Sequence, residues 1–177
     1  MLAAIMVMTA NAQINKGAWL ASASSSLGFN SYSYKAGSNI SVFNTSSKGG
    51  YFFAKNFVLG TDLGYTRWSG SGSGTATVTV IGGFARYYLP KNIFFGAGVN
   101  SATTTFGEGF NNAKTTTTTI PFEVGIAAFL GKNIAVEPSI VYTKGDEKGG
   151  ILYNGQSTGA TSAIALNVAF TVYFNRN

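Results

Sequence analysis

The sequence contains no cysteine and no histidine. Without cysteine, the chain forms no disulfide and offers no thiolate to a metal ion or a redox reaction. Without histidine, it lacks the side chain that most often serves as a general base or metal ligand. The usual hydrolase constellations are therefore excluded. We expect a protein that is not an enzyme and that holds no metal and no cofactor.

Charged side chains are also scarce. They make up 10% of the 177 residues, whereas soluble domains average about 25%. The hydrophobic fraction, 45%, is ordinary, so something other than charge must cover much of the surface, and lipid would do this. The net charge is +6, and much of it falls in or beside the wide loops predicted below, at Lys35, Lys48, Arg67, Lys114, Lys144 and Lys148. A basic rim of this kind either meets acidic lipid head groups or only solubilises the loops.

No apolar run is long enough for a membrane-spanning helix, which needs about 18 residues or more. The longest run, Met1 to Met8, leads into Ala10-Asn11-Ala12, a small-x-small cleavage pattern. We therefore interpret residues 1–12 as a signal peptide, with Gln13 as the first mature residue. No Lys or Arg precedes the run, as in a signal peptide truncated at its start. An apolar N-terminal strand is the alternative interpretation.

Three Lys-Asn dipeptides mark short turns, at Lys55-Asn56, Lys91-Asn92 and Lys132-Asn133. They are 36 and 41 residues apart, which leaves room for two strands of about ten residues and one longer loop. Wide loops are expected near residues 30–45, 66–76, 106–114 and 144–160. Short turns at one end and wide loops at the other are typical of an outer-membrane barrel.

Eight segments alternate with a period of two residues, which is the spacing of side chains on a strand. The clearest is the last, where Ile164, Leu166, Val168 and Phe170 alternate with small or polar residues. The larger apolar set forms one face, and the other is small, Gly-rich and poor in charge. A soluble barrel would need a water-facing surface richer in Lys and Glu. The pattern predicts an all-β fold over residues 13–177, an eight-stranded antiparallel up-and-down transmembrane β-barrel with a narrow, filled lumen.

Aromatic residues cluster near the predicted short turns and the chain end. An amphipathic ring prefers the level of the lipid head groups, so these residues predict an interfacial girdle. The predicted girdle comprises Trp19, Tyr51, Phe52, Phe53, Phe57, Tyr87, Tyr88, Phe94, Phe95, Phe129, Tyr173 and Phe174. Since aromatics favour strands in general, ordinary β-propensity is the alternative explanation.

Four charged residues fall on inward-facing positions of predicted strands. They are Asp62, Arg86, Glu123 and Glu137. A lone buried carboxylate is costly, so we expect an interior ion-pair network centred on Arg86, with Glu137 and Glu123 as its main partners. Such a network would plug the lumen; a proton or ion path is the functional alternative. Paired carboxylates also occur in glycosidases, but a lumen inside a membrane offers no cleft for a sugar chain.

Two short segments allow more than one interpretation. The run Thr115–Thr119 predicts either a polar extension of the sixth strand beyond the bilayer or a flexible loop. Gly17-Ala18-Trp19 is similar to the signature of lipocalins, which are soluble eight-stranded barrels. The chain ends on a strand, however, and shows no late helical segment of the lipocalin kind.

The order of several motifs resembles that of a known family. These motifs are Ala10-Asn11-Ala12-Gln13, the segment from Gly50 to Asn56, Phe84-Ala85-Arg86-Tyr87-Tyr88 and the closing strand through Phe174. Together they are similar to the small outer-membrane β-barrels of Bacteroidetes-type bacteria, related in architecture to the OmpA and OmpX barrels. Such chains often end on an aromatic residue that the barrel-insertion machinery is thought to read. Here Asn175-Arg176-Asn177 follow Phe174.

The resemblance implies an integral protein of the bacterial outer membrane, exported by a cleaved signal peptide. Its expected partners are outer-membrane lipid, the barrel-insertion machinery and an unknown surface ligand. Nucleic acid is not expected, since the aromatics lie in strands rather than beside the charges. A structural or surface-interaction role is the main hypothesis. The alternatives are a narrow channel or transporter and a soluble lipocalin-like barrel.

Overall fold

The structure, a computed structural model, describes residues 14–24, 28–33, 39–70, 74–107, 114–148 and 161–174. The predicted signal peptide and Gln13 lie outside the described residues, so their cleavage stays a prediction. None of the helical structure in the described residues is long and apolar enough to cross a membrane.

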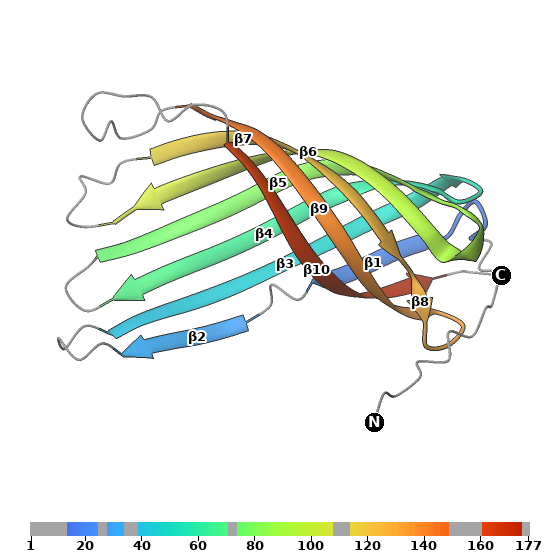
Figure 1. Cartoon of the computed structure of the whole chain (residues 1–177), viewed down its shortest axis with the longest axis horizontal. Helices are drawn as coiled ribbons and strands as arrows, with labels where there is room; N and C mark the ends of the chain where they lie inside the picture. The colour runs from blue at the N-terminus through green and yellow to red at the C-terminus, as the bar shows by residue number, and fades with distance from the viewer. Residues whose placement is uncertain are drawn as a thin grey trace.

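The described strands form one antiparallel sheet that closes on itself (Figure 1). The elements are β1 (Trp19–Ser24), β2 (Gly28–Ser33), β3 (Asn39–Ala54), β4 (Phe57–Gly70), β5 (Gly74–Tyr88), the 3-10 helix η1 (Pro90–Asn92), β6 (Ile93–Phe106), β7 (Lys114–Ile126), β8 (Ala128–Phe129), β9 (Ile134–Lys148) and β10 (Thr161–Phe174). Closure comes from β1, which pairs with β10 on one side and with β3 on the other.

The barrel has eight strand positions. β1 and β2 pair with successive parts of β3 and together fill one position. β8 pairs with β9 beyond the end of β7, and so continues the position of β7. The prediction of an eight-stranded antiparallel barrel is confirmed.

Short turns gather at one end of the barrel, together with the start of β1 and the end of β10 (right in Figure 1). We call this the short-turn end, and the opposite end the loop end. All three Lys-Asn dipeptides lie in these turns. Asn56, Lys91 and Asn92 have φ angles of 62°, 66° and 61°, in the left-handed region that asparagine tolerates better than most residues.

The asparagine of each turn also binds the next hairpin through its main chain. The carbonyl oxygens of Asn56, Asn92 and Asn133 accept hydrogen bonds of 2.9, 2.8 and 2.7 Å from later backbone amides. The donors are Tyr88, Ala127 and Tyr173, respectively. The repeated dipeptide thus closes a turn and links that turn to a later part of the chain at the same end of the barrel.

The strands at the loop end are longer than the sequence pattern predicted. Residues 39–45 lie in β3, 66–70 in β4, 74–76 in β5 and 144–148 in β9, although each range was expected to be loop. The Thr115–Thr119 run belongs to β7, which settles the two interpretations in favour of a strand extension. Threonine, serine and asparagine in these ranges hold the antiparallel ladder although they interrupt the apolar alternation used to find strands.

The two faces of the wall carry different side chains. Outward positions bear the large apolar residues: Leu166 is 83% exposed, Ile164 76% and Phe170 61%. Their neighbours Ala169, Thr171 and Tyr173 point inward and are buried. The predicted assignment of the two faces therefore matches the barrel. An apolar outer wall of this extent suits hydrocarbon rather than water.

Candidate functional site

The barrel interior is the candidate site, and its contents change from one end to the other. At the short-turn end it is filled by an apolar cluster of Ile14, Ala18, Leu20, Phe52, Val58, Phe84, Tyr88, Phe94, Ala127, Ala135 and Tyr173, of which Phe84 reaches furthest toward the loop end and lies against Arg86 and Lys48. Beside this cluster lies a layer of ion pairs. Toward the loop end, hydroxyl groups and a hollow replace both. We call these three layers the apolar plug, the ion-pair layer and the hollow.

Large rings in the apolar plug stand opposite glycines on neighbouring strands. Phe84 of β5 pairs with Gly60 of β4 and Gly98 of β6, and Phe94 of β6 pairs with Gly125 of β7. A Cβ atom on Gly125 would come within 2.5 Å of the Phe94 ring and 2.6 Å of the Pro138 carbonyl oxygen. The inner glycines therefore make room for rings, rather than leaving an open bore.

Four aromatics of the predicted girdle belong to this plug instead. Phe52, Tyr88, Phe94 and Tyr173 are buried and pack on one another with ring centroids 5.6 to 6.2 Å apart. The girdle prediction was wrong for these four. Each of the four is next in sequence to a ring that points outward. Adjacent residues of a strand face opposite sides, so a prediction based only on nearness to a turn assigned inward and outward rings to the same girdle.

Most of the other predicted girdle residues point away from the lumen. Trp19, Phe53, Tyr87, Phe95 and Phe174 are about half exposed on the outer wall. Tyr51 and Phe57 are only partly exposed, and Tyr51 packs between the rings of Trp19 and Phe53 at 4.9 and 5.0 Å. Phe129 packs against the plug, with its ring centroid 5.2 Å from that of Tyr173.

Arg86 is at the centre of the ion-pair layer. Its Nη1 donates to Glu137 Oε2 at 2.7 Å, and its Nη2 to Glu123 Oε2 at 2.9 Å. The guanidinium also lies over the Phe94 ring, 4.1 Å from the ring centroid. Arg86, Glu123 and Glu137 come from β5, β7 and β9, and all three are buried. The structure thus brings together three of the four charged residues singled out in the sequence.

Tyrosine hydroxyls extend this layer into the apolar plug. Arg86 Nη1 donates to the Tyr88 hydroxyl at 3.1 Å, and the Tyr88 and Tyr173 hydroxyls are 3.0 Å apart. The Tyr173 hydroxyl also donates to Glu137 Oε1. Both Glu137 oxygens therefore have a partner, which a buried carboxylate requires.

Lys48 also belongs to this layer, although the sequence pattern predicted a position in or beside a wide loop. Lys48 lies on β3, and its Nζ donates to Glu123 Oε2 at 3.1 Å. The Ser139 hydroxyl donates to the other oxygen, Glu123 Oε1, at 2.8 Å. Lys48 alternates in phase with Gly50 and Phe52, which both face inward. That parity was the available signal, and the unclear start of this strand concealed it.

Asp62 lies apart from the ion pairs. Its Oδ2 accepts a hydrogen bond of 3.2 Å from the Asn100 side-chain amide, and among the described residues it forms no ion pair. The prediction was therefore wrong to place it in the network around Arg86. It faces the lumen on β4 as predicted, but one layer closer to the loop end.

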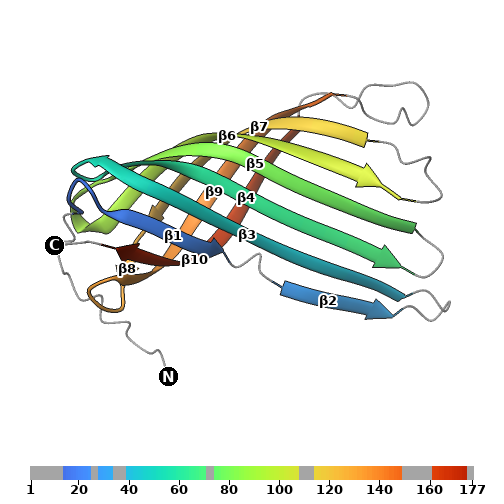
Figure 2. The same ribbon diagram turned by 180° about the vertical axis from the view of Figure 1, so that it is seen from behind.

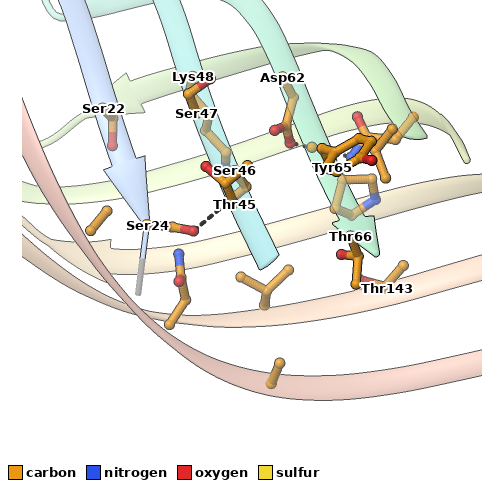
Figure 3. Close-up of a pocket in the computed structure, with 18 of the residues that line it drawn as sticks. Ser22, Ser24, Thr45, Ser46, Ser47, Lys48, Asp62, Tyr65, Thr66 and Thr143 are labelled. Carbon is orange, nitrogen blue, oxygen red and sulfur yellow. Dashed lines mark hydrogen bonds between the residues drawn. The ribbon is translucent and has the colours of Figure 1, made fainter. Parts of the chain in front are cut away.

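The hollow has a volume of about 480 Å³ (Figure 3). Its wall combines hydroxyls from β1 and β3 with the charged groups of Lys48 and Asp62. Ser24 of β1 and Ser46 of β3 are hydrogen-bonded to each other across this wall. Nowhere in the described ranges do His, Cys, Asp and Glu form a group able to hold a metal ion.

Comparison with known sequences does not assign the chain to a family. No protein-family model matches the chain, and no curated protein matches it.

Comparison with solved structures identifies the fold. The crystal structure of Neisserial surface protein A is similar over 89% of this chain and 95% of that one, with 15% identity and a TM-score of 0.50. Outer membrane protein AlkL, solved by solid-state NMR in lipid bilayers, matches over 92% and 89% with 16% identity and a TM-score of 0.47. The β domain of the Bordetella autotransporter BrkA matches over 93% and 81% with 14% identity and a TM-score of 0.41. The first of these supports a small membrane-barrel fold.

Proposed function

We propose that this chain is an integral outer-membrane β-barrel with a structural or surface-interaction role and a lumen closed by its own side chains. The observation that carries the proposal is the pair of layers at the short-turn end. Arg86, Glu123 and Glu137 are buried and paired, and the apolar plug lies directly beside them. Eight strands leave an interior that side chains can fill.

The outer wall supports the membrane part of this proposal. Large apolar side chains are exposed on β1, β3, β4, β5, β6, β7, β9 and β10. Half-exposed rings lie near the short turns. The fold likeness to a surface protein of this size agrees with an outer-membrane location. The proposal also includes export by a cleaved signal peptide and the Bacteroidetes-type, OmpA/OmpX-like affiliation. Its proposed partners are outer-membrane lipid, the insertion machinery and an unknown surface ligand. We further propose that the protein has no enzyme activity.

Gel migration of the membrane fraction tests this location. A folded barrel resists SDS when unheated and shifts on boiling. We expect such a shift, and we expect carbonate washing to leave the protein in the membrane. Release by carbonate with no shift on boiling would contradict the proposal and favour a soluble, lipocalin-like barrel.

A narrow channel is the second candidate, because the lumen is polar toward the loop end. Asp62, Lys48 and the hydroxyls around the hollow would suit ions or water. Conductance of the purified protein in a planar bilayer separates the two candidates. We expect no steady openings. Openings that vanish in Glu123→Gln would establish the channel and refute the plug.

A further inference from the structure

The charged side chains in the turns of the short-turn end all have the same sign. Four exposed lysines lie there, at Lys16, Lys55, Lys91 and Lys132. The turns described at this end hold no Asp or Glu, whereas at the loop end Asp146 and Glu147 stand between two lysines in the sequence. We call the four residues the turn lysines. They form a basic surface, which attracts anions.

Outward rings place the turn lysines at the level of lipid head groups. Rings that are about half exposed lie on the wall beside the same turns, at Trp19, Phe53, Tyr87, Phe95 and Phe174. Such rings prefer the boundary between hydrocarbon and head groups. The turn lysines lie at or just beyond this boundary, because they belong to the turns that follow the rings. Lysines at that level are attracted to anionic lipid head groups.

An apolar groove on the outer wall extends from this end over β6, β7, β9 and β10. Its volume is about 530 Å³. Its larger lining residues are Ile93, Val124, Ile126, Ile140, Leu166 and Val168. Pro138 of β9 lies among them and pairs with Val168 of β10. Because the proline ring is shorter than an isoleucine or leucine side chain, it leaves a depression in the wall.

The groove reaches from the head-group level into the hydrocarbon. Ile93 follows Lys91 by two residues, and Pro138 follows Lys132 by six. Six residues of a strand span about 20 Å, which a tilt of about 40° reduces to a depth of about 15 Å. This depth is half of the roughly 30 Å hydrocarbon core. The groove thus has the reach of an acyl chain in one leaflet.

We propose that this groove and the two lysines of its own strands bind one anionic phospholipid in the leaflet at the short-turn end. The acyl chain lies in the groove over Pro138, and the phosphate meets Lys91 and Lys132. Lys91 directly precedes β6, and Lys132 directly precedes β9. The site rests on the membrane barrel proposed above and names the class of lipid that this barrel binds.

The opposite wall offers matched control positions. β9 and β4 are four positions apart in the ring of eight, and β9 crosses in front of β4 in Figure 1 and behind it in Figure 2. Ile140 on β9 and Leu63 on β4 each lie seven residues after the asparagine of their short turn. They are 48% and 49% exposed. A lipid without preference for the groove should therefore meet both alike.

Photolabelling tests the site. The full chain is reconstituted in dimyristoylphosphatidylcholine vesicles that contain a small fraction of phosphatidylglycerol with a diazirine in one acyl chain, and labelled residues are mapped by mass spectrometry. We expect labelling at Ile140 to exceed that at Leu63 by roughly tenfold. Phosphatidylcholine with the same diazirine should give a much smaller excess. An equal excess with the two probes would overturn the assignment of an anionic head group.

The other outcomes separate this site from the barrel itself. Equal labelling of Ile140 and Leu63 by phosphatidylglycerol would overturn the site and leave the membrane barrel intact. Weaker labelling of Ile140 than of Leu63 by both probes would show that protein, such as a second copy of this chain, covers the groove, and would also overturn the lipid site. Labelling of neither residue would contradict the barrel.

Neutral variants of the turn lysines test the head group. We expect the double variant Lys91→Gln, Lys132→Gln to lower the excess at Ile140 to that of phosphatidylcholine. Lys55→Gln should keep the excess, because Lys55 lies between β3 and β4, which do not line the groove. Salt at about 1 M should act like the double variant, since it screens exposed charges beyond about 3 Å. An excess that survives the double variant would refute the role of these lysines.

A filled groove tests the place of the acyl chain. Pro138→Phe puts a ring over the depression, while Val99→Phe puts the same ring on the outer wall outside the groove, where Val99 is 57% exposed. We expect Pro138→Phe to abolish the excess at Ile140 and Val99→Phe to keep it. Persistence of the excess in folded Pro138→Phe would overturn the proposal. If Pro138→Phe loses its heat-dependent gel shift, Val168→Phe replaces it with the same two outcomes.

Discussion

The two halves of the lumen are built from the same strands but by different means. At the short-turn end, aromatic rings fill the lumen beside the inner glycines of neighbouring strands. The carboxylates of Glu123 and Glu137 both pair with Arg86 there. At the loop end, hydroxyls and the charged groups of Lys48 and Asp62 surround the hollow. The first half resembles the core of a soluble protein, and the second a binding pocket. A side chain's contribution to stability should therefore depend on which half holds it.

Removal of the Arg86 charge should have the largest effect. Arg86→Met leaves Glu137 and Glu123 buried with fewer partners, and we expect the free energy of unfolding to fall by about 3–5 kcal/mol. Reversible urea unfolding in detergent micelles measures this. Arg67→Met, at an exposed position of β4, is the control and should change little. Equal effects of the two substitutions would show that no buried network exists.

Truncation of a plug ring should come next. Phe94→Ala opens a cavity in the plug and should cost about 3–4 kcal/mol. Phe95→Ala removes the same ring from the outer wall, where Phe95 is 52% exposed, and lipid can fill the gap. The same unfolding experiment compares the two. A larger loss for Phe95→Ala would reverse the assignment of inner and outer faces.

Glycine substitutions should have a smaller effect that still depends on the face. Gly125→Ala places a methyl group against the Phe94 ring and the Pro138 carbonyl, so we expect a loss of about 1–3 kcal/mol. Gly83→Ala points outward, where the nearest atom lies 3.7 Å from the new Cβ, and it should be tolerated. Thermal loss of SDS resistance ranks the two variants, and equal midpoints would argue against packed rings in the lumen.

Asp62→Asn should have the smallest effect. The carboxylate makes one hydrogen bond, to Asn100, beside the hollow, so its loss should cost about 1 kcal/mol or less. Glu137→Gln, which breaks the ion pair to Arg86, should cost more in the same unfolding series. A larger cost for Asp62→Asn would place Asp62 within the network and contradict the separation of the two layers.

Much of the fold was predictable because a strand carries its two environments in alternate residues. The closing strand shows this, with Ile164, Leu166 and Phe170 on one face. The same rule brought Arg86, Glu123 and Glu137 into one lumen, since charges at inward positions of a membrane barrel must find partners there.

The errors came from features that depend on neighbouring strands. Phe94 shares the parity of Gly96 and Gly98, and so belongs inside, but a position near a turn suggested an interface. The small inner residues predicted a filled lumen, but the sequence does not tell which ring stands opposite which glycine, as Phe84 does opposite Gly60. The barrel closes through the register with which β1 meets β10, and alternation along one strand carries no information about that register.

The direction of the bulky apolar residues is the central claim, and spin labelling tests it directly. Since the chain has no native cysteine, single cysteines at Leu63, Ile81, Phe122 and Ile140 can each be labelled in vesicles. We expect high collision rates with oxygen, which concentrates in hydrocarbon, and low rates with a water-soluble nickel complex. The reverse at all four positions would show that this face meets water, and would contradict the membrane barrel.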